Sequence, residues 1–231
     1  MMIDFLNTPY FGLIVSILSF EVGLYLYRKT KISLFNPLLI SIALIIWLLS
    51  TFNINIKYYN QGGDLLSFFL GPATVILAVP LYKQFELLKS NLLPILVGII
   101  VGCLSGIISV FFLSKLFGLN SQIGTSLIPK SVTTPIGIEI SKQIGGIPSI
   151  TVAVIIATGI FGAVIGPFIC HLFRVRDEVA VGIAIGTAAH AIGTTRAMEL
   201  GETEGAMSSL AIGVAGLITV IIAPILFALL N

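Results

Sequence analysis

The chain has 231 residues, of which 57% are hydrophobic and 10% are charged, and its formal net charge at pH 7 is +2. A soluble domain carries about 25% charged residues, so this composition requires an outer surface that faces hydrocarbon. The small net charge and the lack of a Lys/Arg-rich run argue against nucleic acid as a partner. The sequence therefore predicts an all-α integral membrane protein.

Two apolar stretches open the chain, at about residues 5–27 and 33–52. No small-residue cleavage site precedes the basic pair Arg28-Lys29. We therefore expect the first stretch to be a retained span and not a cleaved signal peptide.

We expect a single polytopic membrane domain over residues 1–231, with about six to eight transmembrane segments. Residues 1–60 hold two scaffold spans, and residues 61–231 form a core in which apolar spans alternate with three broken, polar segments. The apolar spans of the core lie at about residues 92–116, 150–173 and 207–230.

The first broken segment covers about residues 65–82 and is interrupted by Gly71-Pro72 and again by Pro80. Proline in a first helical turn can start a half-helix, whose free N–H groups and the Thr74 hydroxyl would face a carboxylate. The alternative is a simple kink that neighbouring helices satisfy.

The second broken segment, residues 121–146, is too polar for an ordinary span. It gathers a cation, three hydroxyls and a proline: Lys130, Ser131, Thr133, Thr134 and Pro135. Hydroxyls and exposed amides at such a turn can replace the water around a small polar solute. The alternative is an interfacial amphipathic segment with solvated charges.

The third broken segment, residues 186–201, places polar side chains where a lipid-facing helix carries Leu, Ile and Val. They are His190, Thr194, Thr195 and Arg196, and we expect the helix to break at Gly193. The planar guanidinium of Arg196 can bind a carboxylate through two parallel hydrogen bonds, or it can pair with Glu199. His190 can relay a proton, or it can be a hydrogen-bonded packing residue.

The basic cluster after the first span places that loop in the cytoplasm and the N-terminus outside. The same rule favours a second segment that dips into the membrane and returns on the same face. Spans 33–52, 65–82 and 92–116 then run opposite to 150–173, 186–201 and 207–230, which is the pattern of an inverted repeat with a solute site near the midplane. Hydropathy leaves open whether 121–146 and 186–201 span or re-enter.

Enzymatic activity is not expected. The sequence lacks the G-x-S-x-G elbow, the H-E-x-x-H zinc motif and the phosphate-binding G-x-x-x-x-G-K-[ST] loop. Its two cysteines, Cys103 and Cys170, lie in apolar spans without metal-ligand spacing, so we expect neither a metal nor a cofactor.

Three blocks of the sequence resemble the signature blocks of the LrgB/CidB family. They are Phe69–Gln84 (FLGPATVILAVPLYKQ), Leu127–Ser141 (LIPKSVTTPIGIEIS) and Gly186–Gly213 (GTAAHAIGTTRAMELGETEGAMSSLAIG). The resemblance implies antiholin-like control of murein hydrolases and autolysis, together with a separately encoded small holin-like membrane partner of the LrgA/CidA type. Related proteins are implicated in pyruvate uptake, and the plastid relative is a glycolate/glycerate translocator.

We therefore predict a cell-membrane transporter of small monocarboxylates, of the pyruvate, lactate, glycolate and glycerate class. It would work with the small holin-like partner and form a homo-oligomer. The alternative is an antiholin-like regulator of murein hydrolase activity and autolysis that moves no solute. The sequence names neither the solute nor the coupling ion.

Overall fold

A computed structural model describes residues 6–30, 35–69, 72, 75, 82–83 and 85–230. Every regular element in these residues is a helix, which confirms the predicted all-α fold. The chain divides into two compact units, Met1–Ile76 and Leu77–Asn231. Residue 60, after which the sequence places the core, lies inside a helix, α4 (Ile56–Phe68).

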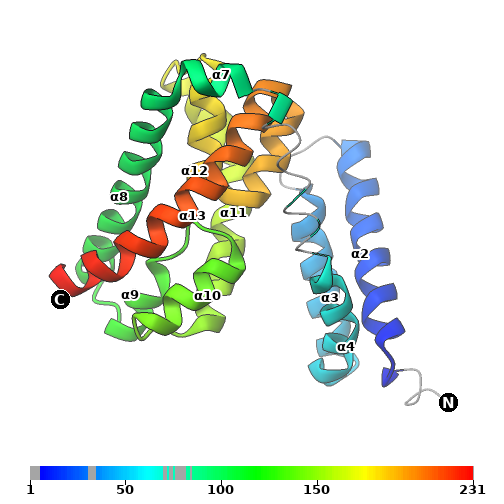
Figure 1. The fold of residues 1–231 in the computed structure, drawn as a ribbon. Coiled ribbons are helices and arrows are strands. Elements are labelled where there is room, and N and C mark those ends of the chain that lie inside the picture. Colours follow the sequence, from blue (N-terminus) through cyan, green and yellow to red (C-terminus); the bar gives the residue numbers. More distant parts are fainter. Residues whose placement is uncertain are drawn as a thin grey trace. The chain divides into compact units, whose positions relative to one another are not determined.

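Helices α2 (Pro9–Thr30), α3 (Pro37–Thr51) and α4 make up the first unit (Figure 1). Sequence reasoning expected two spans here and missed α4, which begins where the Asn55 side chain accepts a hydrogen bond from the Lys57 amide at 3.0 Å. Helix α4 packs on α2 through Gly62, whose Cα–H face touches the α2 backbone near Gly12 and leaves no space for a Cβ atom. Small residues allow this close approach of two backbones.

The apolar spans predicted for the second unit are confirmed as α8 (Leu92–Leu116), α11 (Pro148–Leu172) and α13 (Glu202–Leu230), and α7 (Phe85–Ser90) precedes them. In the described residues these three helices and α2 are long and apolar enough to cross a membrane, and α3 is a shorter apolar helix. The protein is therefore an integral membrane protein. With two re-entrant segments, described next, these helices match the expected six to eight membrane segments.

The first re-entrant segment, residues 121–143, contains the short helices α9 (Ser121–Leu127) and α10 (Thr134–Gln143). Neither helix approaches the 20 residues that a span requires. Both lie at the end of the unit where α8 ends and α11 begins (Figure 1). Gly124 of α9 contacts Ser114 near the end of α8, and Ser126 contacts Ile147 at the start of α11. The segment therefore enters and leaves at one end, as expected for 121–146.

The second re-entrant segment is α12 (Glu178–Leu200), which is not one straight helix. Its backbone is non-helical at His190, with φ 43° and ψ −139°, so it consists of two half-helices, 178–189 and 191–200. These halves fold back on each other, because a Cβ atom on Gly193 would lie 3.0 Å from the side chain of Ile185, eight residues earlier.

Contacts with α13 confirm the reversal in α12. Gly182, near the start of α12, and Met198, near its end, both contact the first turns of α13, at Glu204 and Gly205 respectively. Residues 178–200 therefore enter and leave at the end of the unit where α13 begins. This is the end opposite to that of the first re-entrant segment, because α11 runs between the two.

One part of the expected inverted repeat is visible here. The predicted second triplet corresponds to α11, α12 and α13, with a broken middle member. The predicted first triplet depends on residues 65–82, most of which lie outside the described residues. Within the described unit, the segment that faces α12 from the opposite end is residues 121–143.

Candidate functional site

The turns of the two re-entrant segments meet beside the first half of α11. His190, at the turn of α12, contacts the carbonyl oxygen of Ile155 through Nε2 at 3.0 Å. Gly137, just after the turn of the first segment, packs against the Ile155 side chain. Ile155 is the eighth residue of α11, so at 1.5 Å per residue it lies about 11 Å from the start of the helix. The turns therefore lie well inside the span.

A cleft of about 730 Å³ lies between α8 and the first half of α12, with the turn of the first segment contributing two of its residues. Its polar lining residues are Asn91, Ser105, Ser109, Lys130, Ser131, Asp177 and Thr187. Three glycines of α8 also line it: Gly98, Gly102 and Gly106. Only one of them, Gly102, meets a close neighbour, because its Cβ position lies 2.8 Å from Thr187 Cγ2.

Lys130 also lines a second cleft, of about 520 Å³, between α11 and the first half of α12. Ala184 and Ala188 of α12 are shared by the two clefts as well. The Lys130 ammonium donates a hydrogen bond to Ser131 Oγ at 3.0 Å. Of the predicted site residues that the structure describes, Lys130 and Ser131 line these clefts.

The predicted residues that follow in the first segment mark the start of α10. Thr133 is the N-cap of α10 without a side-chain capping bond, and Thr134 and Pro135 form its first turn. Proline there is compatible with the helix because the N–H it lacks has no intrahelical partner. Thr133 and Thr134 are partly buried and lie outside the lining of the two clefts.

His190 is buried, with 2% of its surface exposed, and its imidazole fixes the turn of α12 to α11. Because a carbonyl only accepts, Nε2 carries the proton in this contact. The backbone of His190 adopts a left-handed conformation that non-glycine residues adopt only at a cost of about 1–3 kcal/mol. Such strain, held in place by surrounding contacts, is typical of functional sites.

Thr194 is buried and links the turn of α12 to α13. Its hydroxyl donates to the His190 carbonyl at 3.0 Å and lies 2.7 Å from Ser208 Oγ of α13. Gly193, by contrast, is not where the helix breaks. The non-helical residue is His190, and Gly193 instead provides the space in which the second half of α12 packs against Ile185.

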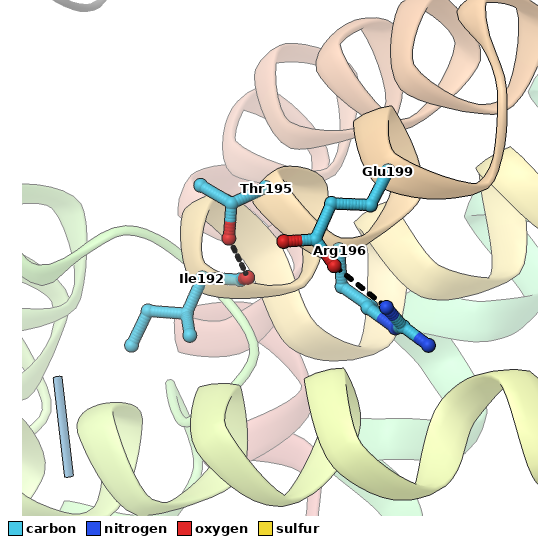
Figure 2. A network of polar contacts seen from close by, with 4 residues as sticks. All are labelled: Ile192, Thr195, Arg196 and Glu199. Carbon is cyan, nitrogen blue, oxygen red and sulfur yellow. Dashed lines mark hydrogen bonds and ion pairs between the residues drawn. The ribbon is translucent and has the colours of Figure 1, made fainter. Parts of the chain in front are cut away.

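Thr195 is exposed and Arg196 is partly exposed, and Figure 2 shows their polar contacts within α12. The Thr195 hydroxyl donates to the Ile192 carbonyl at 2.7 Å, and Arg196 Nη1 pairs with Glu199 Oε2 at 2.6 Å. The Arg196 and Glu199 side chains are 33% and 50% exposed. The structure therefore places the guanidinium in the local ion pair that the sequence offered as an alternative, outside the lining of both clefts.

Predictions for the first broken segment fall almost wholly outside the described residues. This applies to Gly71, Thr74 and Pro80. Pro72 is described, and it is helical and exposed.

Sequence reasoning missed a buried hydroxyl network that holds the first re-entrant segment to α11. Thr151 Oγ1 lies 2.8 Å from both the Ser126 carbonyl oxygen and Ser141 Oγ, and Ser126 Oγ accepts from the Ile147 amide at 2.7 Å. All three hydroxyl residues are fully buried. Their sequence signal is weak, because hydroxyls in membrane helices commonly bond to their own helix backbone.

These features define an all-helical integral membrane protein whose core holds two re-entrant segments with a polar centre. The LrgB-like family profile matches residues 16–229. Antiholin-like protein LrgB of Bacillus cereus (strain B4264) and that of Bacillus anthracis (strain CDC 684 / NRRL 3495) are each 41% identical over 218 residues, covering 94% of this chain and 95% of theirs. No solved structure matches the chain. The chain belongs to the LrgB family of antiholin-like membrane proteins, which is not an enzyme family.

Proposed function

We propose that this protein is a carrier for small monocarboxylates, of the pyruvate, lactate, glycolate and glycerate class. The observation that carries the proposal is the pair of re-entrant segments that enter from opposite ends and meet beside a cleft lined by Lys130. In secondary transporters, interrupted helices of this kind meet near the midplane, and the solute binds between them.

The surroundings of Lys130 support an anionic solute. Within the described residues, the Lys130 ammonium bonds to the neutral Ser131 hydroxyl and forms no ion pair with a carboxylate. A partly buried cation at membrane depth is costly without an anionic partner. A small carboxylate in the cleft would supply that partner, and the neighbouring hydroxyls would bind its remaining oxygens.

The other predicted site residues take supporting roles in this proposal. His190 and Thr194 hold the turn of α12 against α11 and α13, so that the cleft keeps its shape. Thr133 and Thr134 mark the start of α10, three residues after Lys130 in the chain. Thr195 and Arg196 would meet the solute only outside the clefts, where Arg196 is paired with Glu199.

We further propose the cell membrane as the location, with the N-terminus outside. Arg28 and Lys29, in the last turn of α2, would then face the cytoplasm, as the positive-inside rule requires. A separately encoded small holin-like subunit of the LrgA/CidA type and a homo-oligomeric assembly are part of the same proposal. The large exposed apolar side chains of the described helices would face lipid or these partners.

The second candidate function is control of murein hydrolases and autolysis without solute transport. The relatives are named antiholin-like proteins, which favours this function. A regulator of this kind needs a surface for its partner but no site for a small anion. The two functions therefore differ in whether the purified chain moves a solute.

Uptake of labelled pyruvate, lactate and glycolate into liposomes tests the proposal, with and without the small partner. We expect saturable uptake by the unmodified chain that Lys130→Ala abolishes. Lys142→Ala is the matched control, because Lys142 is exposed and pairs with Glu139 at 2.7 Å. Arg196→Lys in the same assay measures whether the guanidinium of Arg196, which pairs with Glu199, contributes to uptake. No uptake in either preparation, or equal uptake by Lys130→Ala, would overturn the carrier proposal as stated.

A further inference from the structure

Thr187 differs from the other buried threonines of the described helices. Thr187 is 7% exposed. Among the described residues, its hydroxyl is the one buried polar side-chain group that has no hydrogen-bond partner. Threonines in helices usually bond to a carbonyl one turn earlier. Thr194 and Thr219 do so here, at 3.0 and 2.7 Å. An unpaired buried hydroxyl is unfavourable, so its retention calls for a partner that is not part of the chain.

The position of Thr187 indicates where that partner binds. Thr187 lies one turn before His190 and lines the same cleft as Lys130 and Ser131. Its methyl group faces Gly102 of α8, where a Cβ atom would lie only 2.8 Å from Cγ2. A β-branched side chain has few rotamers in a helix, so this contact limits the directions that the hydroxyl can take.

The cleft has room for the movement that would uncover this hydroxyl. Gly106, one turn further along α8, also lines the cleft and has no atom within 4 Å of its Cβ position. Ala184 and Ala188 of the first half of α12 line the cleft on either side of Thr187, and their side chains are small. A solute that enters beside Lys130 can therefore reach Thr187 after a small shift of α12 against α8.

We infer that Thr187 binds the solute and recognises the second oxygen of a small 2-oxo or 2-hydroxy carboxylate, whose carboxylate group pairs with Lys130. The inference rests on the proposed function and adds a specificity-determining residue to it. A threonine hydroxyl can donate to a 2-oxo group and accept from a 2-hydroxy group. A carboxylate without this oxygen would leave the hydroxyl unpaired, and such sites discriminate against analogues that lack the bonding group.

Pyruvate and propionate are suitable probes, because they have the same chain length and differ in the 2-oxo oxygen. We would measure binding by the ligand-induced rise in Tm of the purified full chain, and transport by uptake into liposomes. We expect the unmodified chain to prefer pyruvate by about tenfold, the value of one good hydrogen bond. Thr187→Val should lose this preference by weakening pyruvate alone, and Thr187→Ser should retain it.

The ligand-free proteins provide a check on folding. Because the hydroxyl has no protein partner, Thr187→Val should have an unchanged or higher Tm than the unmodified chain. A lower Tm for Thr187→Val would mean that the hydroxyl bonds to the protein, and would overturn the inference.

The two readouts separate this inference from the proposed function. Thr187→Val could still show saturable uptake and change the uptake of pyruvate and propionate equally, or change neither. Either result would overturn the role of Thr187 and leave the carrier proposal intact. Thr187-dependent pyruvate binding without uptake would support the site and contradict transport. Neither binding nor uptake of pyruvate by the unmodified chain would overturn both.

Discussion

The two re-entrant segments reach the same part of the membrane core by different physical means. The first, residues 121–143, is held by a network of buried hydroxyls centred on Thr151, and its turn spans several residues between two short helices. The second, α12, reverses at the single residue His190, and glycines bring its halves into contact with each other and with α13.

The difference shows how a turn can be stabilised inside a membrane. Lipid provides no hydrophobic force between helices, so association depends on close packing and on internal hydrogen bonds. In the first segment, hydrogen bonds between Ser126, Ser141 and Thr151 add to apolar packing of Ile128, Val132 and Ile140. In the second, glycines allow close packing on α13, and two polar contacts add to it: Thr194 with Ser208 of α13, and His190 with the Ile155 carbonyl of α11. Each segment should therefore be sensitive to a different kind of substitution.

The largest effect is expected from added volume in the second segment. Gly186→Leu would force a side chain into Ser208 and Ala211 of α13. Atoms of both residues lie within 2.8 Å of the position that a Cβ atom of residue 186 would take. We expect at least about 3 kcal/mol of destabilisation and little folded protein in membranes. Gly213→Leu is the matched control, because nothing lies within 4 Å of its Cβ position.

Yield of folded protein and Tm in detergent measure this difference. Equal yields for Gly186→Leu and Gly213→Leu would contradict the close packing of α12 on α13.

A smaller loss is expected when one hydroxyl is removed from the first segment. Thr151→Val keeps the volume but leaves Ser126 and Ser141 without their shared partner, which should lower the free energy of unfolding by about 1–3 kcal/mol. Thr195→Val is the control, because the exposed Thr195 hydroxyl bonds only to the carbonyl of Ile192 in its own helix. Unfolding of both variants in detergent measures the loss, and similar stabilities would show that the network contributes little.

The smallest effect concerns the strained turn itself. His190→Gly and His190→Ala both remove the imidazole, but only glycine relieves the left-handed backbone. We expect His190→Gly to be more stable than His190→Ala by about 1 kcal/mol. The reverse sign is expected at Ala191, a helical and exposed position, where glycine should cost about 0.8–1.0 kcal/mol. Melting curves of the three variants give these differences, and the same sign at both positions would contradict the strain.

Much of the fold follows from the order of side chains alone. Runs of apolar residues predicted α8, α11 and α13 closely, because a span in hydrocarbon must be a helix of about 20 apolar residues. The polar composition of residues 121–146 excluded an ordinary span, and the positive-inside rule favoured a segment that dips and returns. Hydropathy did not predict α4, because its polar residues resemble those of a loop. The contact of Gly62 with α2 is visible only in the structure.

The site was only partly within reach of the sequence. Lys130 and Ser131 stood out because charge and hydroxyls are rare at membrane depth. Arg196 stood out for the same reason, yet the structure pairs it with Glu199 outside the clefts. The choice between a solute and a neighbouring carboxylate depends on side-chain direction, which residue spacing does not determine.

The sequence by itself therefore determined the class of protein, its spans and the segments where polar chemistry is concentrated, since each depends on whether local side chains tolerate hydrocarbon. Only the tertiary structure decided that α12 reverses at His190 and not at Gly193, that the two turns meet at Ile155, and that Thr187 is left unpaired. Each of these outcomes depends on contacts between residues distant in the chain, which local composition does not specify.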